Sequence, residues 1–177
     1  MAGRAHPAAV VKVPVTRPVF GDEEVAAVAE VLASGWVVQG PKVAAFEQLW
    51  AEFTGAAFAR ATTSCTTALH LALLAIGVGP GDEVLVPAFT WIATANAVEY
   101  CGATPVFVDV DDHTFNIDPS DIEHRVGERT KAIVPVHEFG LSADMHAVMT
   151  IAAARGLRVV EDAACAAGSR LDGQHVG

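Results

Sequence analysis

Hydrophobic residues in the first third of the chain recur at the spacing of an α-helix. The first stretch begins with an acidic segment directly after Gly21 and ends near Gly35. The second runs from Val43 to Phe53 and stops at Gly55. Apolar residues three and four positions apart lie on one face of a helix. The pattern therefore predicts two amphipathic helices, and we expect the aromatic side chains of the second to pack in the core.

From residue 58 onward, short apolar runs alternate with stretches of helical spacing. The runs predict strands at residues 58–61, 84–86, 105–108, 132–136 and 158–161. The stretches between them predict helices at residues 68–77, 91–100, 119–126 and 145–154. Strands separated by helices pair in parallel, because each helix carries the chain back across the sheet. The expected fold class is α/β, a three-layer α/β/α arrangement with a mostly parallel sheet.

Composition narrows the partners that such a domain can have. The chain of 177 residues is 52% hydrophobic and carries a formal net charge of -10. Nucleic acids and anionic membrane surfaces are bound by clusters of lysine and arginine, so the charge argues against both. The most apolar run, residues 68–78, is too short to span a bilayer. We therefore expect no nucleic acid and no membrane among the partners.

The three cysteines, at positions 65, 101 and 165, are far apart in the sequence. They form neither a CxxC pair nor a cysteine and histidine cluster with metal-ligand spacing, so no disulfide framework and no metal site are expected. Reduced cysteines are typical of the cytoplasm, which is the location that we predict. Residues 1–15 have no continuous apolar core and are predicted to form a flexible arm, with residues 16–177 as one continuous α/β unit.

The loops that follow the strands carry the candidate chemistry, because ligands of open α/β sheets bind at the carboxyl ends of the strands. Residues 62–67 are small and mostly hydroxylated, and they lead from a predicted strand into a helix. Free backbone N–H groups, hydroxyls and the helix dipole converge there, which is typical of a phosphate site. The segment matches neither GxxxxGK[ST] nor GxGxxG. A capping cluster without a ligand is the alternative.

Two further loops each offer one distinctive side chain. Trp91, shortly after a strand, is either a wedge in the core or a flat surface on which a planar ring can stack. Asp162, after the last strand, is either a cap or a carboxylate that faces a ligand. A phosphate cradle, an aromatic plate and a carboxylate together suit a phosphorylated heteroaromatic cofactor with a protonated ring nitrogen. Pyridoxal 5'-phosphate (PLP) fits that description.

Five blocks of sequence resemble, in the same order, the amino-terminal part of the DegT/DnrJ/EryC1/StrS family. The blocks are residues 64–73, 79–84, 87–97, 102–110 and 160–164. The resemblance extends over nearly everything from Val15 to the end of the chain. It implies a fold-type I, PLP-dependent sugar aminotransferase, of which this chain holds an incomplete large domain.

The resemblance also implies roles for individual residues. The cofactor phosphate is expected to be held by Ser64, Cys65 and Thr66. The same resemblance implies that Trp91 stacks on the pyridine ring and that Asp162 pairs with the ring nitrogen.

Two positions depart from the family pattern. Cys165 stands where many members carry a glutamine near the phenolic oxygen of the cofactor, and a thiol is a weak hydrogen-bond partner. Cys165 is nevertheless counted among the expected cofactor-binding residues. Glu138 stands where an apolar residue is more usual, and the only role that we expect for it is a substrate contact.

In the family, a lysine downstream of the aspartate motif holds the cofactor as a Schiff base and carries a proton. The lysines of this chain are Lys12, Lys42 and Lys131, and none has a matching sequence context. No catalytic residue is therefore assigned, and the chain is expected to be a fragment that ends before that lysine and before the carboxy-terminal domain. The predicted strand at residues 58–61 would also lack two later neighbours, so we expect the fragment to fold poorly alone.

The activity implied by the resemblance is transfer of an amino group, from glutamate as the small-molecule donor, to a nucleotide-linked keto-sugar or to a keto-cyclitol. The full-length enzyme is expected to be a homodimer. A PLP-dependent sugar dehydratase, with a histidine in place of the lysine, is the alternative within the family. Two alternatives come from other classes: a non-catalytic domain that binds a phosphorylated ligand or a partner subunit, and a truncated reading frame without activity.

Overall fold

The computed structural model describes residue 14 and residues 17–177, and it divides into two parts at Lys42. The first part contains the helix α1 (Asp22–Ser34), which ends at Gly35 in the left-handed region with φ 71°. Its first turn is acidic, and the Glu24 carboxylate accepts a hydrogen bond from the Gly21 N–H at 2.6 Å. The predicted first helix is confirmed. The predicted arm, residues 1–15, lies outside the described residues except for Pro14.

The second part is built on a sheet of four parallel strands in the order β2-β1-β3-β4. The strands are β1 (Glu83–Pro87), β2 (Thr104–Val108), β3 (Thr130–Ile133) and β4 (Arg158–Val159). The helices that precede and connect them are α3 (Cys65–Ala75), α4 (Ala93–Tyr100), α5 (Pro119–Arg125) and α6 (Met145–Arg155). All of these elements were predicted within a few residues.

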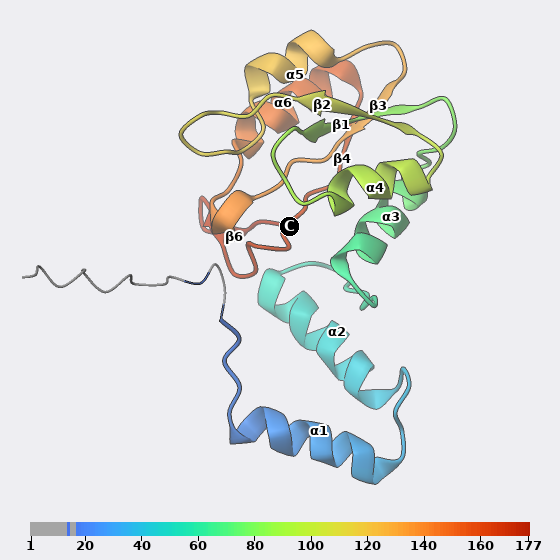
Figure 1. Ribbon diagram of the computed structural model, residues 1–177, viewed down its shortest axis with the longest axis vertical. Helices are drawn as coiled ribbons and strands as arrows, with labels where there is room; N and C mark the ends of the chain where they lie inside the picture. Colours follow the sequence, from blue (N-terminus) through green and yellow to red (C-terminus); the bar gives the residue numbers. More distant parts are fainter. Residues whose placement is uncertain (1–13, 15–16) are drawn as a thin grey trace, which may run out of the picture. The chain divides into compact units, whose positions relative to one another are not determined.

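Helices cover both faces of this sheet (Figure 1). Alternate residues of a strand point to opposite faces, so Val84 and Val86 of β1 pack in a cluster with α3 and α4. Leu85 packs in the opposite cluster with α5 and α6. The two clusters place the sheet between two helical layers and confirm the three-layer α/β/α prediction.

The predicted strand at residues 58–61 is wrong, because this segment is irregular. It has no strand beside it, and the sheet of the described chain ends at β2 and β4. The Ala61 N–H instead donates to the Glu47 carboxylate at 2.9 Å, from the helix α2 (Pro41–Thr54). A side chain thus satisfies a backbone group that a neighbouring strand would otherwise pair.

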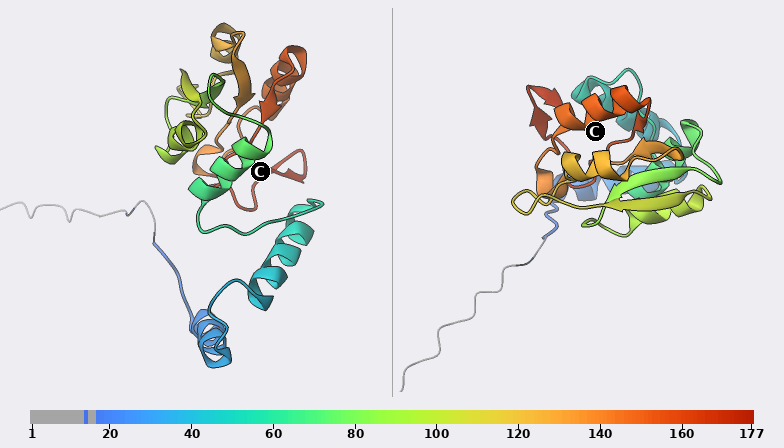
Figure 2. Two further views of the ribbon diagram at one scale, coloured as in Figure 1. Left: turned by 90° about the vertical axis from the view of Figure 1, so that its right-hand side faces the viewer. Right: turned by 90° about the horizontal axis from the view of Figure 1, so that it is seen from above.

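The sequence patterns did not predict a small antiparallel hairpin near the end of the chain. Its strands are β5 (Arg170–Leu171) and β6 (Gln174–His175), which form a separate two-stranded sheet apart from the main one (Figure 2). The turn residues Asp172 and Gly173 both have positive φ, 50° and 81°. An Asp-Gly turn is a strong hairpin signal, so the local sequence did contain the information.

The second predicted helix is confirmed as α2, but its aromatic residues do not pack in the core as expected. Phe46, Trp50 and Phe53 are 53%, 38% and 52% exposed. Glu47 and Ala51 are half-buried, so the helix packs on the rest of the second part through a less apolar stripe. The rings contact one another instead, with centroids 5.9 Å apart for Phe46 and Trp50 and 5.6 Å apart for Trp50 and Phe53.

Among the described residues, no helix is both long and apolar enough to cross a bilayer. The division at Lys42 does not test the predicted boundary between the arm and the α/β unit, which stays a prediction.

Candidate active site

Asp162 lies at the carboxyl edge of the sheet, where it extends the pairing of β3 and β4. Its N–H donates to the Pro135 carbonyl at 2.9 Å, and its carbonyl accepts from the His137 N–H at 3.0 Å. This parallel bridge, between Val136 and Asp162, fixes the backbone on both sides of the residue. The residue is only 6% exposed, so it is neither a surface acid nor a mobile one.

The Asp162 carboxylate gathers donors from three different segments. The Thr94 hydroxyl donates to Oδ2 at 3.1 Å, and the Ala164 N–H donates to Oδ1 at 3.1 Å. The Cys65 thiol also contacts Oδ1, at 3.7 Å. The loop at residues 62–67 and the start of α4 therefore meet at this acid, through Cys65 and through Thr94.

The thiol of Cys65 is held in its neutral form. Although the residue as a whole is exposed, its sulfur lies partly covered beside Asp162. Burial, reinforced by the charge and the hydrogen bond of Asp162 and by the nearby Cys165, raises the pKa of the Cys65 thiol to about 11. At neutral pH the thiol therefore donates its hydrogen to the carboxylate instead of competing with it for charge.

The predicted phosphate residues form the amino end of α3. The Ser64 hydroxyl caps the helix by accepting from the Thr67 N–H at 3.2 Å, and it also lies 3.0 Å from the Thr67 hydroxyl. The N–H groups of Cys65 and Thr66 belong to the first turn, which has no helical acceptors for them. Ser64 and Cys65 line a hollow of about 520 Å³. The capping hydroxyl of Ser64 and the first turn of α3 thus lie beside an open space.

The two other predicted residues flank this acid less directly. Trp91 is 79% exposed, and its carbonyl accepts from the Thr94 N–H at 3.1 Å, so it is one turn of chain away from the Asp162 contact. Of the two alternatives for its ring, the core wedge is therefore excluded, and the face of the indole is open. Cys165 is exposed, and its effect on the Cys65 pKa places it near that thiol.

Glu138 lies in the same site, directly after the paired segment of β3. It is 7% exposed, and its N–H donates to the Asn116 side-chain oxygen at 2.9 Å. Burial raises the pKa of the Glu138 carboxyl, the Thr90 hydroxyl opposes that rise, and the charge of Asp162 adds to it. Two carboxyls therefore share this edge of the sheet, with Thr90 and Thr94 between them, their hydroxyls 3.2 Å apart.

A hydrogen bond between the buried His137 and the half-buried Glu161 supports the site. His137 is fully buried, its Nδ1 accepts from the Ala143 N–H at 3.1 Å, and its Nε2 lies 2.9 Å from Glu161 Oε2. Because Nδ1 is an acceptor, the single ring proton is on Nε2 and is donated to Glu161. This hydrogen bond lowers the pKa of the Glu161 carboxyl. The pair joins the two segments that continue into Glu138 and Asp162.

The sequence patterns did not single out Thr94, Thr90 or the His137 and Glu161 pair. For the two threonines a signal existed: they are four residues apart at the start of a helix, where such residues share a face. For the pair, no local pattern indicates that two residues 24 positions apart form a hydrogen bond just beyond the ends of adjacent strands.

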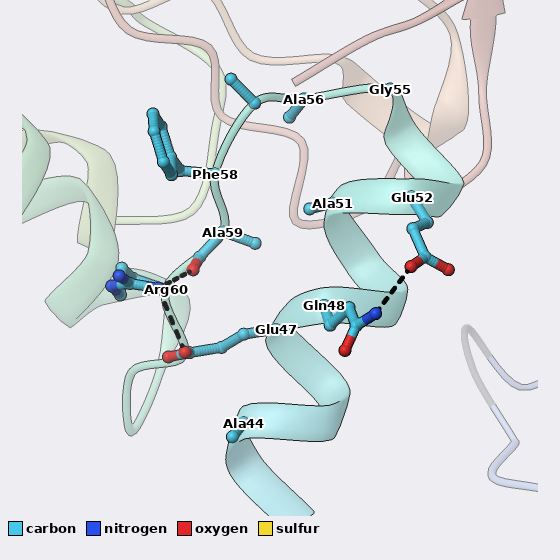
Figure 3. Close-up of a pocket in the computed structure, with 11 residues that line it drawn as sticks. Ala44, Glu47, Gln48, Ala51, Glu52, Gly55, Ala56, Phe58, Ala59 and Arg60 are labelled. Carbon is cyan, nitrogen blue, oxygen red and sulfur yellow. Dashed lines mark hydrogen bonds and ion pairs between the residues drawn. The ribbon is translucent and has the colours of Figure 1, made fainter.

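A second hollow, of about 550 Å³, lies between α2 and residues 55–60 (Figure 3). Glu47 reaches across it to Arg60 at 3.2 Å, and Gln48 bonds to Glu52 at 3.0 Å on the helix surface. It contains none of the predicted site residues, and five of its eleven lining residues are alanines. The predicted site residues lie instead at the carboxyl edge of the sheet and at the start of α3.

Neither lysine with a described position fits the role of the Schiff-base amine. Lys131 is exposed at the amino end of β3, the end opposite Asp162. Lys42 pairs with Glu30 at 2.8 Å in the first part, and Lys12 lies outside the described residues. No group of three or more histidine, cysteine or acidic side chains in the described chain is arranged to hold a metal ion.

Three proteins with solved structures have the same fold and related sequences. DesV from S. venezuelae, solved with a ketimine intermediate, is 43% identical with a TM-score of 0.85, over 88% of this chain and 42% of its own. The synthase of 3-amino-5-hydroxybenzoic acid is 46% identical with a TM-score of 0.86, over 90% and 42%. Spr1654 from Streptococcus pneumoniae, solved in PLP and PMP forms, is 33% identical with a TM-score of 0.88, over 94% and 46%.

The chain spans less than half the length of these relatives. The family model of the DegT/DnrJ/EryC1/StrS aminotransferase family matches residues 18–177, which include every residue of the carboxyl-edge site. The chain therefore belongs to the DegT/DnrJ/EryC1/StrS aminotransferase family.

Proposed function

We propose that this chain supplies the amino-terminal half of the cofactor site of a PLP-dependent aminotransferase. The enzyme transfers an amino group from glutamate to a nucleotide-linked keto-sugar or to a keto-cyclitol. The observation that carries the proposal is the buried Asp162 carboxylate, held by three donors at the edge where the loop at 62–67 and the start of α4 meet.

The residues present fit the cofactor in charge and in chemistry. The free N–H groups at the start of α3 suit a phosphate dianion, and the exposed Trp91 ring suits a flat pyridine. The Asp162 carboxylate suits a protonated ring nitrogen, because its neighbours donate neutral hydrogen bonds and leave its negative charge uncompensated. When bound, PLP supplies an aldehyde for the amino group and an electron-withdrawing ring.

This chain binds the cofactor and polarises its ring. Asp162 holds a proton at the ring nitrogen, and burial strengthens that charge interaction relative to water. Ser64, Cys65 and Thr66 anchor the phosphate, and Trp91 keeps water from one face of the ring. The Schiff-base lysine, whose amine moves protons at the reacting carbon, is not assigned to any lysine of this chain. We also infer a homodimeric enzyme, and a cytoplasmic location from its three free thiols.

A binding experiment with the 177-residue chain tests the cofactor assignment. PLP is titrated against the unaltered chain and against Asp162→Asn by equilibrium dialysis, with circular dichroism to verify folding. Loss of one charge-assisted hydrogen bond is expected to raise the Kd at least about tenfold. Asp112→Asn, at an exposed acid, is the matched control and should bind as the unaltered chain does. Equal affinity in Asp162→Asn would refute the assignment.

A second measurement, on the whole enzyme, separates transamination from simple binding. Glutamate and a nucleoside-diphosphate keto-sugar are supplied, and formation of 2-oxoglutarate is followed. Asp162→Ala should abolish turnover while some PLP remains bound. PLP binding without any 2-oxoglutarate from the unaltered enzyme would instead support a non-catalytic binding domain.

A further inference from the structure

Glu138 is a buried carboxyl that lacks a complete set of partners. The residue is 7% exposed, and within the described chain its Oε1 atom is fully buried without a hydrogen bond. Burial of a carboxyl oxygen without a partner is costly, so such groups are rare in folded proteins. An orphaned oxygen at the edge of a ligand site indicates that a ligand atom completes it.

The backbone around Glu138 is fixed, so the side chain has not simply been left loose. The Asn116 side chain accepts from the Glu138 N–H at 2.9 Å and donates to the carbonyls of Leu141 and Ser142 at 3.2 and 3.1 Å. The next residue, Phe139, has φ 53°, a conformation that is unfavourable for a residue with a side chain. Strain of this kind persists where the surroundings enforce it, and it is common at ligand sites.

Glu138 lies on a defined side of Asp162. Cys65, from the phosphate cradle, contacts the Oδ1 atom of Asp162. The opposite oxygen, Oδ2, accepts from Thr94, whose hydroxyl is 3.2 Å from that of Thr90. Because the Thr90 hydroxyl acts on the Glu138 carboxyl, the order along this edge is phosphate cradle, Asp162, the two threonines and then Glu138.

Around the ring of PLP, the phosphate arm, the ring nitrogen and the ring hydroxyl follow one another in the order of the phosphate cradle, Asp162 and Glu138. The arm that carries the phosphate and the ring hydroxyl are attached on opposite sides of the ring nitrogen. A ring with its nitrogen at Asp162 and its phosphate at α3 therefore turns its hydroxyl away from Cys65. We propose that Glu138 binds the ring hydroxyl of PLP through its free Oε1 atom. This inference rests on the proposed cofactor assignment and adds a residue to it.

The two carboxyls then have different tasks. Asp162 has donors on both oxygens, whereas burial, together with the nearby charge of Asp162, raises the pKa of the Glu138 carboxyl and so favours its protonated form. A protonated carboxyl donates a hydrogen bond to the oxygen of the ring hydroxyl.

The test compares PLP with an analogue that lacks the ring hydroxyl, by equilibrium dialysis against the 177-residue chain. The unaltered chain should prefer PLP by about tenfold, the size expected for one hydrogen bond to a buried acid. Glu138→Leu should bind both ligands with nearly equal affinity. Glu138→Gln keeps a donor of the same shape and should keep the preference to within about threefold. Glu128→Leu, at an exposed acid, is the matched control.

Each result decides between the two proposals. If Glu138→Leu remains folded by circular dichroism and keeps the full preference for PLP, the role of Glu138 is refuted and the cofactor assignment stands. If the unaltered chain binds PLP but does not distinguish it from the analogue, the role of Glu138 is refuted as well. If the unaltered chain is folded by circular dichroism and binds neither ligand, both proposals are refuted.

Discussion

Asp162 and Cys65 act as one unit, because the carboxylate stabilises the proton of the thiol. With a pKa of about 11, only about one per cent of the Cys65 thiol is ionised at pH 9. Asp162→Asn removes the negative charge, so the thiol should ionise more easily and react faster. We expect alkylation of Cys65 by iodoacetamide at pH 9 to accelerate by about tenfold, as followed by peptide mass spectrometry.

The size of the change in the alkylation rate separates the effect of the Asp162 charge from the effect of burial on the Cys65 thiol. Burial is the largest cause of the raised pKa, and Asp162→Asn leaves it in place. The rate should therefore remain below that of a free thiol even in the variant. Asp112→Asn serves as the control and should leave the Cys65 rate unchanged. A rate in Asp162→Asn equal to that of the unaltered chain would show that the carboxylate does not act on the thiol.

Glu138 should destabilise the ligand-free chain. Because its Oε1 atom is buried without a partner, Glu138→Leu removes a desolvation penalty and adds apolar packing. We expect the free energy of unfolding to rise by about 1–3 kcal/mol, measured by urea denaturation without PLP. Glu128→Leu, on the surface, should change it by less than about 0.5 kcal/mol. Destabilisation by Glu138→Leu would mean that the carboxyl is already satisfied.

The sequence alone was enough to find the residues that follow strand ends, but not their partners. Asp162 and the hydroxylated loop were recognisable because parallel strands end at one edge. That Thr94, and not Trp91, touches Asp162 depends on where α4 begins, and this helix starts two residues later than its apolar pattern suggested. The orphaned oxygen of Glu138 is a property of packing, which no pattern of residue types encodes.

The adjacent strands β3 and β4 are locked at their carboxyl ends by the His137 and Glu161 pair. The pKa of Glu161 is lowered in the folded chain from its ordinary value of 4.5. Its stabilising contribution is therefore complete above about pH 5 and is lost as the pH falls through the lower folded value. Glu161→Gln should cost about 1 kcal/mol at pH 7, and the difference from the unaltered chain should shrink by pH 3.

Urea denaturation of both proteins at a series of pH values measures this difference directly. Any titration that the two proteins share, including that of other acids, cancels in the comparison. Glu123→Gln, at an exposed acid of α5, should give curves that match those of the unaltered chain. A difference that stays constant from pH 7 to pH 3 would show that the charge of Glu161 is not what stabilises the two segments.

Helices were easier to predict than the first strand, for a physical reason. A helix closes its hydrogen bonds within its own segment, so local signals such as Gly156 at the end of α6 are sufficient. A strand needs a neighbour to complete its hydrogen bonds. Residues 58–61 have a strand-like sequence but no neighbouring strand in the described chain, and their pattern could not reveal that.

The second part as a whole leaves an unusual amount of apolar surface uncovered along α2. Phe46, Leu49, Trp50 and Phe53 lie within two turns of each other and are each at least 38% exposed. Contiguous apolar surface of this kind marks an interaction site in most proteins. The opposite side of the helix, with Gln48 and Glu52, is polar (Figure 3). A second copy of the chain is the partner that we expect, in line with the proposed homodimer.

Sedimentation velocity over a range of concentrations tests this expectation. The unaltered chain should self-associate at micromolar concentration, and Leu49→Lys should weaken association by about tenfold or more, because it places a charge in the apolar stripe. Gln48→Lys adds the same charge one residue away, on the polar side of α2, and should change association by less than about twofold. If both variants weaken it equally, net charge and not the stripe is responsible. If the unaltered chain stays monomeric at every concentration, α2 is not a contact between copies of this chain.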